Sequence, residues 1–525
     1  MATNTEYLKK NRFKDAYDVI VVGGGVGGLS GALHAAKAGK SVLLLEQHNL
    51  PGGFATSFVR GEYEWEATVH EIFCIDYPNR PGPTRIMLDE LGVDWEMLRV
   101  PENYSIILPE EGIDCMVPTS IQGAIDTIEA AAPGNKKELT RYFKVCQQFY
   151  EGINYFNDTV NNGTKPSIKT MVTKYPYLLR YANKTVAEVD KDFKFTDRCK
   201  DILYAYWCYL GPALDEETMV QWAYALYGYI DTGAYEPAHR SYDFVLSLVD
   251  AIRKAGGQVE MNCRVDKIHV KNGRIQGVSL YDGTFIKTHY IMSNTAAENV
   301  YHNLIEPKSE VPEFSIKKTN AMVNSCSAIT LYVGLNKEAK EIGIDRYDYF
   351  IGTTMDTAKI HDDWYTLNPT EFVSAICLDN AVPGATGKGK CQLSITGLLM
   401  GEEWKKVTPE NYFKIKDRMA KELLDMWTYG TGIDLTPYIE EVEMVTPETW
   451  SRYASAYQGQ VFGYEMSPWN SLLTRNLAAK EEQKKEIHGL FYVGGPSNIG
   501  HGYGGSLKSG AQVIEKIEEE MEEDK

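Results

Sequence analysis

The chain has 525 residues, of which 43% are hydrophobic and 24% charged, a composition typical of a globular protein long enough for two domains. Its 54 basic and 72 acidic side chains give a formal net charge of −18, which argues against nucleic acid or an anionic membrane surface as the main ligand but leaves a shallow apolar contact with lipid open. The nine cysteines are scattered and form no Cys-x-x-Cys pair. This pattern predicts reduced thiols, and we expect neither a disulfide framework nor a zinc site.

The start of the chain shows no secretory signal, because residues 1–16 are polar and contain no apolar core region. No run approaches the roughly 18 apolar residues of a membrane-spanning helix. We therefore expect a cytoplasmic protein that is at most peripherally associated with a membrane, and we expect no metal site.

The first elements are predicted to be a strand, a glycine-rich turn, a helix and a second strand. Residues 18–22 form a short β-branched run, residues 29–38 carry apolar side chains at helical spacing, and residues 41–45 form another apolar run. Together they predict one βαβ unit of a Rossmann-type parallel sheet.

The turn between the first strand and the helix has the spacing of a dinucleotide site. Gly23 permits the tight turn, Gly25 lets the backbone approach a pyrophosphate at the helix N-terminus, and Gly28 permits close packing of helix on strand. The acid Glu46 follows after about 20 residues, at the end of the second strand, where it can accept hydrogen bonds from ribose hydroxyls. These residues predict a site for the ADP half of a dinucleotide.

Two further glycine-rich segments favour FAD over NAD. Pro51-Gly52-Gly53 predicts a second close backbone approach, which a cofactor that extends further than NAD would need. Residues 489–506 predict a strand, a loop rich in glycine and a helix whose N-terminus can face an electron-rich group.

The rest of the chain is predicted to build two interwoven domains. A helix is expected at 242–255, hairpin turns at Asn272-Gly273 and Asp282-Gly283, and strands at 258–263, 265–270, 274–280, 289–293, 328–335 and 392–399. We predict an α/β fold in which a discontinuous FAD-binding domain (1–78, 230–297 and 486–525) is interwoven with an α+β substrate domain (79–229 and 298–485).

These motifs together resemble the FAD-binding frame shared by phytoene desaturases, carotenoid cis-trans isomerases and retinol saturases. The likeness rests on the Gly23 to Gly28 turn, Glu46, Gly52-Gly53, residues 265–268 and residues 489–510. Further similar stretches at 328–335, 445–450 and 459–463 extend it nearly from end to end. The resemblance implies an FAD domain of the amine-oxidase and phytoene-desaturase type, with lipid-like polyenes as typical substrates.

The resemblance also implies the residues that would contact FAD. Glu46 would meet the adenosine ribose, Val265 the adenine, and the loop from Gly502 to Gly505 the pyrimidine edge of the flavin. The remaining expected contacts are Gly23, Gly25, Val26, Gly27, Gly28, Gln47, Gly53, Phe54, Ala55, Thr56, Val69, His70, Gly494, Gly495, Tyr503 and Gly504.

Three positions depart from the family pattern. Gly494-Gly495 stands where the family has Gly-Asp, so the carboxylate expected at the ribityl chain is missing. Residues 236–241 replace a Pro-x-Gly-Gly motif, and residues 66–68 replace Asp-x-Gly. These departures bear on the substrate more than on the cofactor.

Four side chains are candidates for catalysis. Flavin performs the hydride chemistry, so the protein has to bind, orient and supply a proton. His70 and Glu71 should lie beside the ring system, while His501 and Tyr503 stand in a loop otherwise made of glycine. An ordinary structural role is the alternative for each pair.

His239 and Arg240 are candidates for binding a substrate carboxylate, because arginine presents a planar fork to such a group. A surface loop without a ligand is the alternative.

The sequence thus predicts an FAD-dependent oxidoreductase or isomerase that acts by hydride transfer on carbon-carbon double bonds of an apolar substrate, whether carotenoid, retinoid or fatty-acid-like. Saturation, desaturation and isomerisation all stay open. The alternatives are a flavin amine oxidase and a non-catalytic carrier of lipid or prenyl groups. NAD(P)H or another electron donor, a peripheral membrane contact and a homodimer are also left open as partners.

Overall fold

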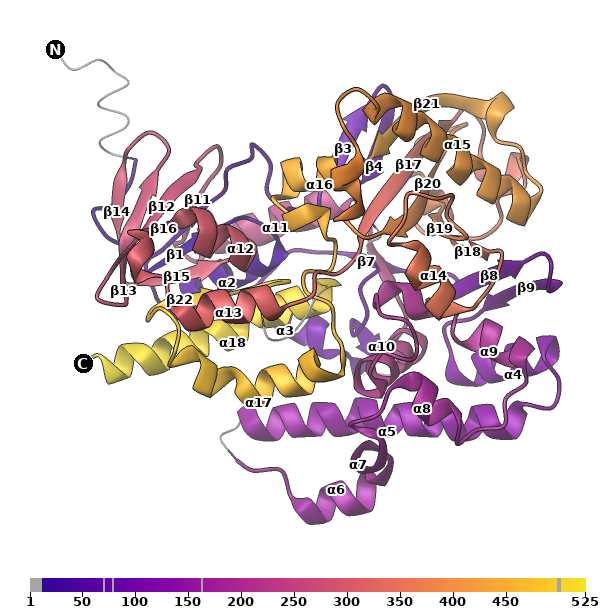
Figure 1. Cartoon of the computed structure of the whole chain (residues 1–525), viewed down its shortest axis with the longest axis horizontal. Helices are drawn as coiled ribbons and strands as arrows, with labels where there is room; N and C mark the ends of the chain where they lie inside the picture. Colours follow the sequence, from indigo (N-terminus) through magenta and orange to yellow (C-terminus); the bar gives the residue numbers. More distant parts are fainter. Residues whose placement is uncertain (1–11, 69–70, 78–79, 162–163, 498–501) are drawn as a thin grey trace.

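A parallel five-stranded sheet forms the centre of one half of the molecule (Figure 1). The computed structural model describes residues 12–68, 71–77, 80–161, 164–497 and 502–525. In spatial order the strands are β11 (Gln258–Glu260), β2 (Val42–Leu45), β1 (Val19–Val22), β15 (Tyr290–Ser293) and β22 (Leu490–Tyr492). Every neighbouring pair is parallel, which confirms the predicted Rossmann-type sheet.

Both faces of this sheet are covered by other elements. Successive side chains of a strand point to opposite faces, so each strand contributes side chains to both packing layers. Val19 and Val21 pack with helices α2 (Val26–Lys37), α11 (Ser241–Lys254) and α18 (Gly502–Glu523) in one core cluster. Ile20 and Val22 belong to a second cluster on the opposite face, together with residues of a smaller sheet. The sheet is therefore the middle layer of three.

The smaller sheet has the order β14-β13-β12-β16, with β14 at Phe285–Lys287, β13 at Arg274–Leu280, β12 at Val265–Lys271 and β16 at Ile305–Glu306. Asn272 and Gly273 between β12 and β13 have φ values of 53° and 69°, which confirms the predicted hairpin turn. Because β16 pairs with β12, this half of the molecule extends past residue 297, where we predicted a boundary; the domain division itself stays a prediction.

The predicted elements around the nucleotide turn agree with the structure to within a few residues. The strand predicted at 258–263 is three residues shorter in the structure, since β11 ends at Glu260. The chain turns there because Asn262 takes a left-handed conformation with φ 54°. The amide of Cys263 then donates a hydrogen bond to the carbonyl of Glu46, outside the ladder between β11 and β2.

A seven-stranded sheet forms the other half of the molecule (Figure 1). Its order is β21 (Ile439–Val445), β17 (Ser327–Leu335), β20 (Cys391–Leu399), β19 (Phe372–Ile376), β18 (Asp348–Gly352), β8 (Tyr104–Leu108) and β9 (Ile113–Val117). The predicted strands at 328–335 and 392–399 are confirmed as β17 and β20. Helix α15 (Tyr412–Thr431) packs on one face of the sheet.

A helical layer lies below this sheet in Figure 1. It contains α5 (Lys136–Asn161), α7 (Pro176–Tyr181) and α10 (Met219–Thr232), whose buried side chains share a large aromatic cluster, and the outlying helix α6 (Ile168–Lys174). The nine cysteines are buried free thiols. In the described ranges, no helix combines the length and the apolar character needed to cross a membrane.

Candidate active site

The glycine turn after β1 wraps around the acid at the end of β2. Gly23 has φ 100°, a left-handed conformation that favours glycine, and the amide of Gly24 donates to Glu46 Oε2 at 2.6 Å. Glu46 Oε1 accepts a hydrogen bond from the amide of His48 at 2.7 Å. A carboxylate offers about four lone-pair positions, so Glu46 keeps acceptor capacity toward the cavity that it lines.

The segment Pro51-Gly52-Gly53 lies directly against this first turn. The amide of Gly52 donates to the carbonyl of Gly24 at 2.7 Å, and a Cβ atom on Gly53 would lie 3.3 Å from Gly25 Cα. Gly52 and Gly53 have φ values of 116° and 62°. The backbone of Gly52-Gly53 thus closely approaches the first glycine turn. The two segments together form one wall of a cavity.

Glycines also bring helix α2 into backbone contact with its neighbours. A Cβ on Gly28 would lie 2.0 Å from the carbonyl oxygen of Gly23, and one on Gly27 would lie 2.4 Å from the amide nitrogen of Gly494. Both distances are far below van der Waals contact. The close packing of helix on strand expected at Gly28 is confirmed, and Gly27 extends it to the loop after β22.

Asn294 joins these segments, although the sequence motifs do not single it out. Its Oδ1 accepts a hydrogen bond from the amide of Gly28 at 3.1 Å, and its Nδ2 donates to the carbonyl of Val493 at 3.0 Å. The residue directly follows β15, and ligands of such sheets bind beyond the carboxyl ends of the strands. That position is the signal in the sequence that could have identified Asn294.

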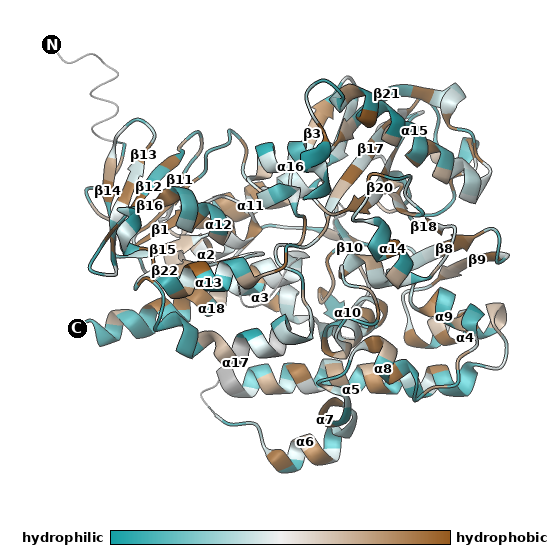
Figure 2. Ribbon diagram, viewed as in Figure 1, coloured by the Kyte–Doolittle hydropathy of each residue, from teal (hydrophilic) through white to brown (hydrophobic). Residues whose placement is uncertain are grey.

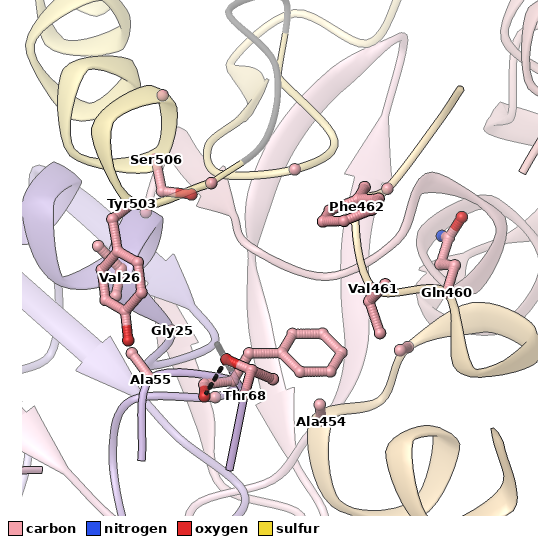
Figure 3. Close-up of a pocket in the computed structure, with 18 of the residues that line it drawn as sticks. Gly25, Val26, Ala55, Thr68, Ala454, Gln460, Val461, Phe462, Tyr503 and Ser506 are labelled. Carbon is pink, nitrogen blue, oxygen red and sulfur yellow. Dashed lines mark hydrogen bonds between the residues drawn. The ribbon is translucent and has the colours of Figure 1, made fainter. Parts of the chain in front are cut away.

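A continuous cavity of about 1400 Å³ begins at Glu46 and reaches helices α5, α7 and α10. Sites for one small molecule usually measure about 300 to 1,000 Å³, so this cavity has room for a dinucleotide and a second molecule. Figure 3 shows its middle part, where Tyr503, Val26 and Ala55 face Val461 and Phe462 across the space.

The end of the cavity far from Glu46 is aromatic and apolar. Phe73, Tyr224 and Tyr229 line it, with the ring centroids of Phe73 and Tyr229 at 4.7 Å. Leu178 from α7 and Met171 from α6 complete this end. Such a lining selects for an apolar molecule, because few of its groups can replace the hydrogen bonds of a polar one.

Most of the predicted cofactor residues line this cavity. Among the residues that the structure describes, they are Gly23, Gly25, Val26, Gly27, Glu46, Gln47, Gly53, Phe54, Ala55, Thr56, Val265, Gly495, Gly502, Tyr503 and Gly504. Gly28 and Gly494 lie behind the wall, where they allow backbone packing. Val69, His70 and His501 lie outside the described residues.

Gly495 stands at the cavity wall where the family pattern has an aspartate. A Cβ added there would lie 3.7 Å from Gly463 Cα, which is an ordinary contact. The structure therefore has space for a small side chain at 495, and crowding does not explain the departure from the pattern.

Glu71 is the one predicted catalytic acid in the described part of the chain, and it lines the cavity. Only 6% of its surface is exposed, and its Oε2 accepts a hydrogen bond from Tyr206. Its Oε1 has no hydrogen-bond partner among the described residues. Burial is the main cause that raises the pKa of Glu71 to about 8, so the carboxyl group is largely protonated at neutral pH and can donate.

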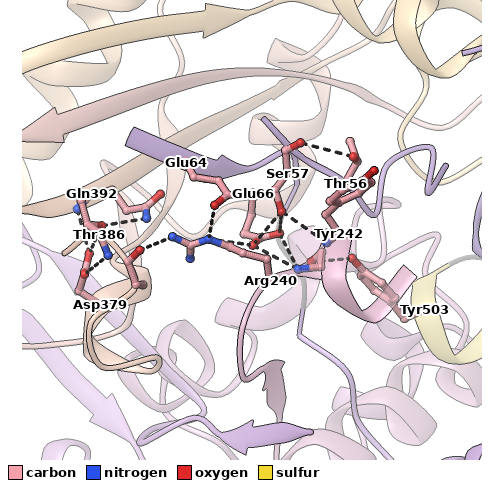
Figure 4. Close-up of polar contacts among 12 residues, drawn as sticks. Thr56, Ser57, Glu64, Glu66, Arg240, Tyr242, Asp379, Thr386, Gln392 and Tyr503 are labelled. Atoms are coloured by element: carbon pink, nitrogen blue, oxygen red, sulfur yellow. Dashed lines mark hydrogen bonds and ion pairs between the residues drawn. The ribbon is translucent and has the colours of Figure 1, made fainter. Parts of the chain in front are cut away.

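Tyr503 lines the same cavity from the start of α18. Its hydroxyl donates to Ser241 Oγ at 3.4 Å, and burial raises the pKa of Tyr503 well above its usual range, so the phenol keeps its proton. The amide of Ser241 in turn donates to Glu66. Figure 4 shows Glu66 in a buried polar network with Ser57 and Arg240. Burial also raises the pKa of Glu66, to about 7.

Arg240 belongs to that network (Figure 4). Its Nε lies 3.7 Å from Glu64 and 3.9 Å from Glu66, and its guanidinium donates to the carbonyl of Ala385. His239 is exposed. Neither Arg240 nor His239 is among the described residues that line the cavity, so this placement gives their predicted role in substrate binding no support.

Comparisons with known proteins agree with the nucleotide site. Residues 18–73, which include the glycine turn, Glu46 and Gly53, match a family model described as FAD dependent oxidoreductase.

Relatives known by sequence cover most of the chain. An all-trans-retinol 13,14-reductase of Danio rerio is 23% identical over 86% of this chain and 78% of its own. A chloroplastic prolycopene isomerase of Daucus carota is 20% identical over 95% and 80%, and a phytoene desaturase of Fusarium fujikuroi is 22% identical over 95% and 89%. The resemblance expected from the sequence is confirmed.

Solved structures show the same fold. An oxidoreductase from Methanosarcina mazei has a TM-score of 0.58 at 15% identity and covers 95% of this chain and 100% of its own. Cyclohexylamine oxidase from Brevibacterium oxydans has a TM-score of 0.59 at 17% identity, with coverage of 97% and 100%.

The described residues fit FAD. Glu46 offers a carboxylate at the cavity wall, the facing glycines leave room for a pyrophosphate at the N-terminus of α2, and the cavity continues past Val26 and Ala55 far enough for a flavin. The site, the family match and these relatives together identify the chain as an FAD-dependent oxidoreductase, similar to phytoene desaturases, carotenoid isomerases and retinol saturases.

Proposed function

We propose that this protein acts on carbon-carbon double bonds of an apolar, lipid-like substrate of the carotenoid, retinoid or fatty-acid class. The observation that carries the proposal is a continuous cavity of about 1400 Å³, which joins the nucleotide turn to an aromatic end and exceeds the usual volume of a site for one small molecule. The names of the relatives support the substrate class, because retinol, prolycopene and phytoene are long apolar polyenes.

FAD would be held by its two ends. Glu46 would bind the adenosine ribose, and the amides at the N-terminus of α2 would face the pyrophosphate. Residues 53–56 would lie along the ribityl chain, and Tyr503 and Gly504 would lie beside the ring system. When bound, FAD supplies hydride transfer, and the protein has to orient the substrate and exclude water.

Glu71 would hold the proton that the substrate exchanges. It lines the chamber with Phe73 and Tyr229, and a neutral carboxyl group is the form able to donate. The hydrogen bond from Tyr206 fixes one carboxyl oxygen, and the other is buried without a hydrogen-bond partner among the described residues. Saturation needs such a proton, whereas an isomerase could return it to the same group.

The proposal is tested by identifying what the purified protein carries. The holoprotein should be yellow, and mass spectrometry of an organic extract should detect FAD together with an apolar polyene or fatty-acid-like molecule. Protein that purifies colourless and stays so after addition of FAD would contradict both the cofactor and the reaction.

Two further assays separate the alternatives. Release of hydrogen peroxide from a panel of amines would favour an amine oxidase, which shares the fold. Tight flavin binding without photoreduction, together with a retained lipid, would favour a carrier.

A further inference from the structure

Residues 164–184, here called the α6–α7 segment, are basic in an otherwise acidic chain. The segment contains five cationic side chains and no aspartate or glutamate, whereas the whole chain has a net charge of −18. The cations are Lys165, Lys169, Lys174, Arg180 and Lys184. Arg180 pairs with Asp192, but among the described residues Lys165, Lys169 and Lys174 form no ion pair.

The same segment exposes large apolar side chains. Ile168 is 80% exposed, Val172 55% and Leu179 52%. Ile168 and Val172 are one helical turn apart on the same face of α6, and no residue of α6 is buried. Figure 1 shows α6 at the lower edge of the molecule, on the far side of α5 from the seven-stranded sheet, and Figure 2 shows hydrophobic and hydrophilic residues mixed along it.

The lysines of α6 flank the apolar stripe. At 3.6 residues per turn, Lys169 projects about 100° to one side of Ile168, and Lys174 about 120° to the other. Their long aliphatic stems allow the ammonium groups to reach outward while the apolar side chains between them are buried in a partner. An amphipathic surface helix that binds in the interface of a bilayer has this arrangement.

The cavity reaches this segment. Met171, Leu178 and Leu179 all line the cavity, and Leu179 is also half exposed. An apolar wall therefore continues from the surface to the chamber formed by Phe73 and Tyr229.

We propose that the α6–α7 segment docks on an anionic lipid surface, so that the end of the cavity lined by this segment faces the bilayer. The local positive charge complements anionic headgroups, and the exposed apolar side chains enter the boundary between headgroups and acyl chains. A second copy of the chain is the less favoured partner, because a stable dimer buries roughly 800 Å² of surface on each subunit. Three apolar side chains on two short helices offer less.

Docking at this place would let an apolar substrate pass from the bilayer into the cavity without crossing water. This consequence rests on the proposed function, whereas the docking itself does not. The net charge of the whole chain had argued against an anionic membrane as the main ligand; the charge of this segment favours it as a local contact.

The test is cosedimentation of the purified holoprotein with vesicles. The wild type should bind vesicles of phosphatidylcholine mixed with phosphatidylserine more tightly than vesicles of pure phosphatidylcholine. At high salt the affinities for the two kinds of vesicle should become equal. Ile168→Asp/Val172→Asp should weaken binding to the mixed vesicles at least about tenfold. Neither residue lines the cavity, so FAD content and activity on detergent-dispersed substrate should be unchanged.

A matched control replaces exposed apolar residues elsewhere. Phe413→Asp/Val442→Asp alters side chains that are 71% and 44% exposed, and it should bind vesicles as the wild type does. The proposal is overturned if the wild type does not bind the mixed vesicles, if both double variants bind equally, or if the Ile168 variant instead converts a dimer to a monomer. A wild type that binds vesicles but turns over no apolar substrate would contradict the proposed function alone.

Discussion

Glu46 has two tasks, since its carboxylate accepts backbone hydrogen bonds within the turn and also faces the cavity. At the scale of single residues, this acid and Glu71 mark the two ends of the site. The first would recognise a sugar and the second would hold a proton. The role of Glu71 depends on its protonation state, because burial raises the pKa of this carboxyl group to about 8.

Glu46→Ala should weaken FAD binding about tenfold or more, because hydrogen bonds to a charged acceptor contribute roughly 1.5 to 3 kcal/mol. Flavin fluorescence titration of the apoprotein measures the change. Glu313→Ala is the control, because the Glu313 side chain is 81% exposed and is not among the residues that line the cavity. Equal affinity of the two variants would show that Glu46 does not meet the ribose.

Glu71→Gln should lower the rate of turnover by roughly 10² to 10⁴ while leaving FAD affinity unchanged, if Glu71 donates the proton. The donating form is the neutral one, so the wild-type rate should be constant below the raised pKa of about 8 and should fall as the pH rises through it. The variant should lack this decline. A pH profile that is the same in both proteins would assign the proton to another group.

At the scale of elements, the site depends on how closely helix α2 approaches β1 and the loop after β22. That approach exists because Gly27 and Gly28 have no side chains. Backbone atoms block the space on both sides, so a larger residue cannot be accommodated by rotating a neighbouring side chain.

Gly27→Ala should destabilise the protein by about 1 to 3 kcal/mol and release FAD, because the added methyl group would meet the backbone of Gly494 at 2.4 Å. Thermal unfolding and flavin content measure the two effects. Gly495→Ala is the matched control in the same loop, where the added Cβ makes only an ordinary contact at 3.7 Å. If both variants keep wild-type stability and flavin, the packing argument is wrong.

The elements with a strong local pattern could be predicted from the sequence. The β1, α2 and β2 unit has a glycine turn and clear apolar periods, so its bounds differ from the prediction by at most a few residues. The hairpin of β8 and β9 lies in a stretch for which we predicted no individual strand. In the structure the residues of β9 alternate between buried and exposed, but the exposed Met116 is apolar, so the sequence shows the alternation only at Asp114.

Contacts between distant segments could not be predicted in the same way. Asn294 bonds to residues 266 and 199 positions away, and no local pattern records these partners. Arg240 has the chemistry of a carboxylate ligand, but folding places it beside Glu64 and Glu66. A residue type defines what a side chain can bind, whereas the fold decides which partner it meets.

At the scale of the whole molecule, two sheets and a helical layer enclose a cavity that none of them forms alone. The Rossmann-type half supplies Glu46 and the glycine turn, the seven-stranded sheet contributes Thr330 and Ser374, and the helical layer supplies the aromatic end. A second molecule in the chamber would therefore lie between the halves and next to the expected flavin position. This arrangement is the physical basis for a reaction between the cofactor and an apolar substrate.

The most direct test of this account is anaerobic photoreduction of the purified holoprotein, followed by addition of retinoids, carotenoids or unsaturated fatty acids under exclusion of oxygen. We predict that at least one of these polyenes restores the absorbance of oxidised flavin while losing a double bond, or undergoes isomerisation in the presence of reduced flavin. If reduced flavin persists and every polyene is recovered unchanged, while amines reduce the oxidised flavin, the assignment to carbon-carbon double bonds is contradicted.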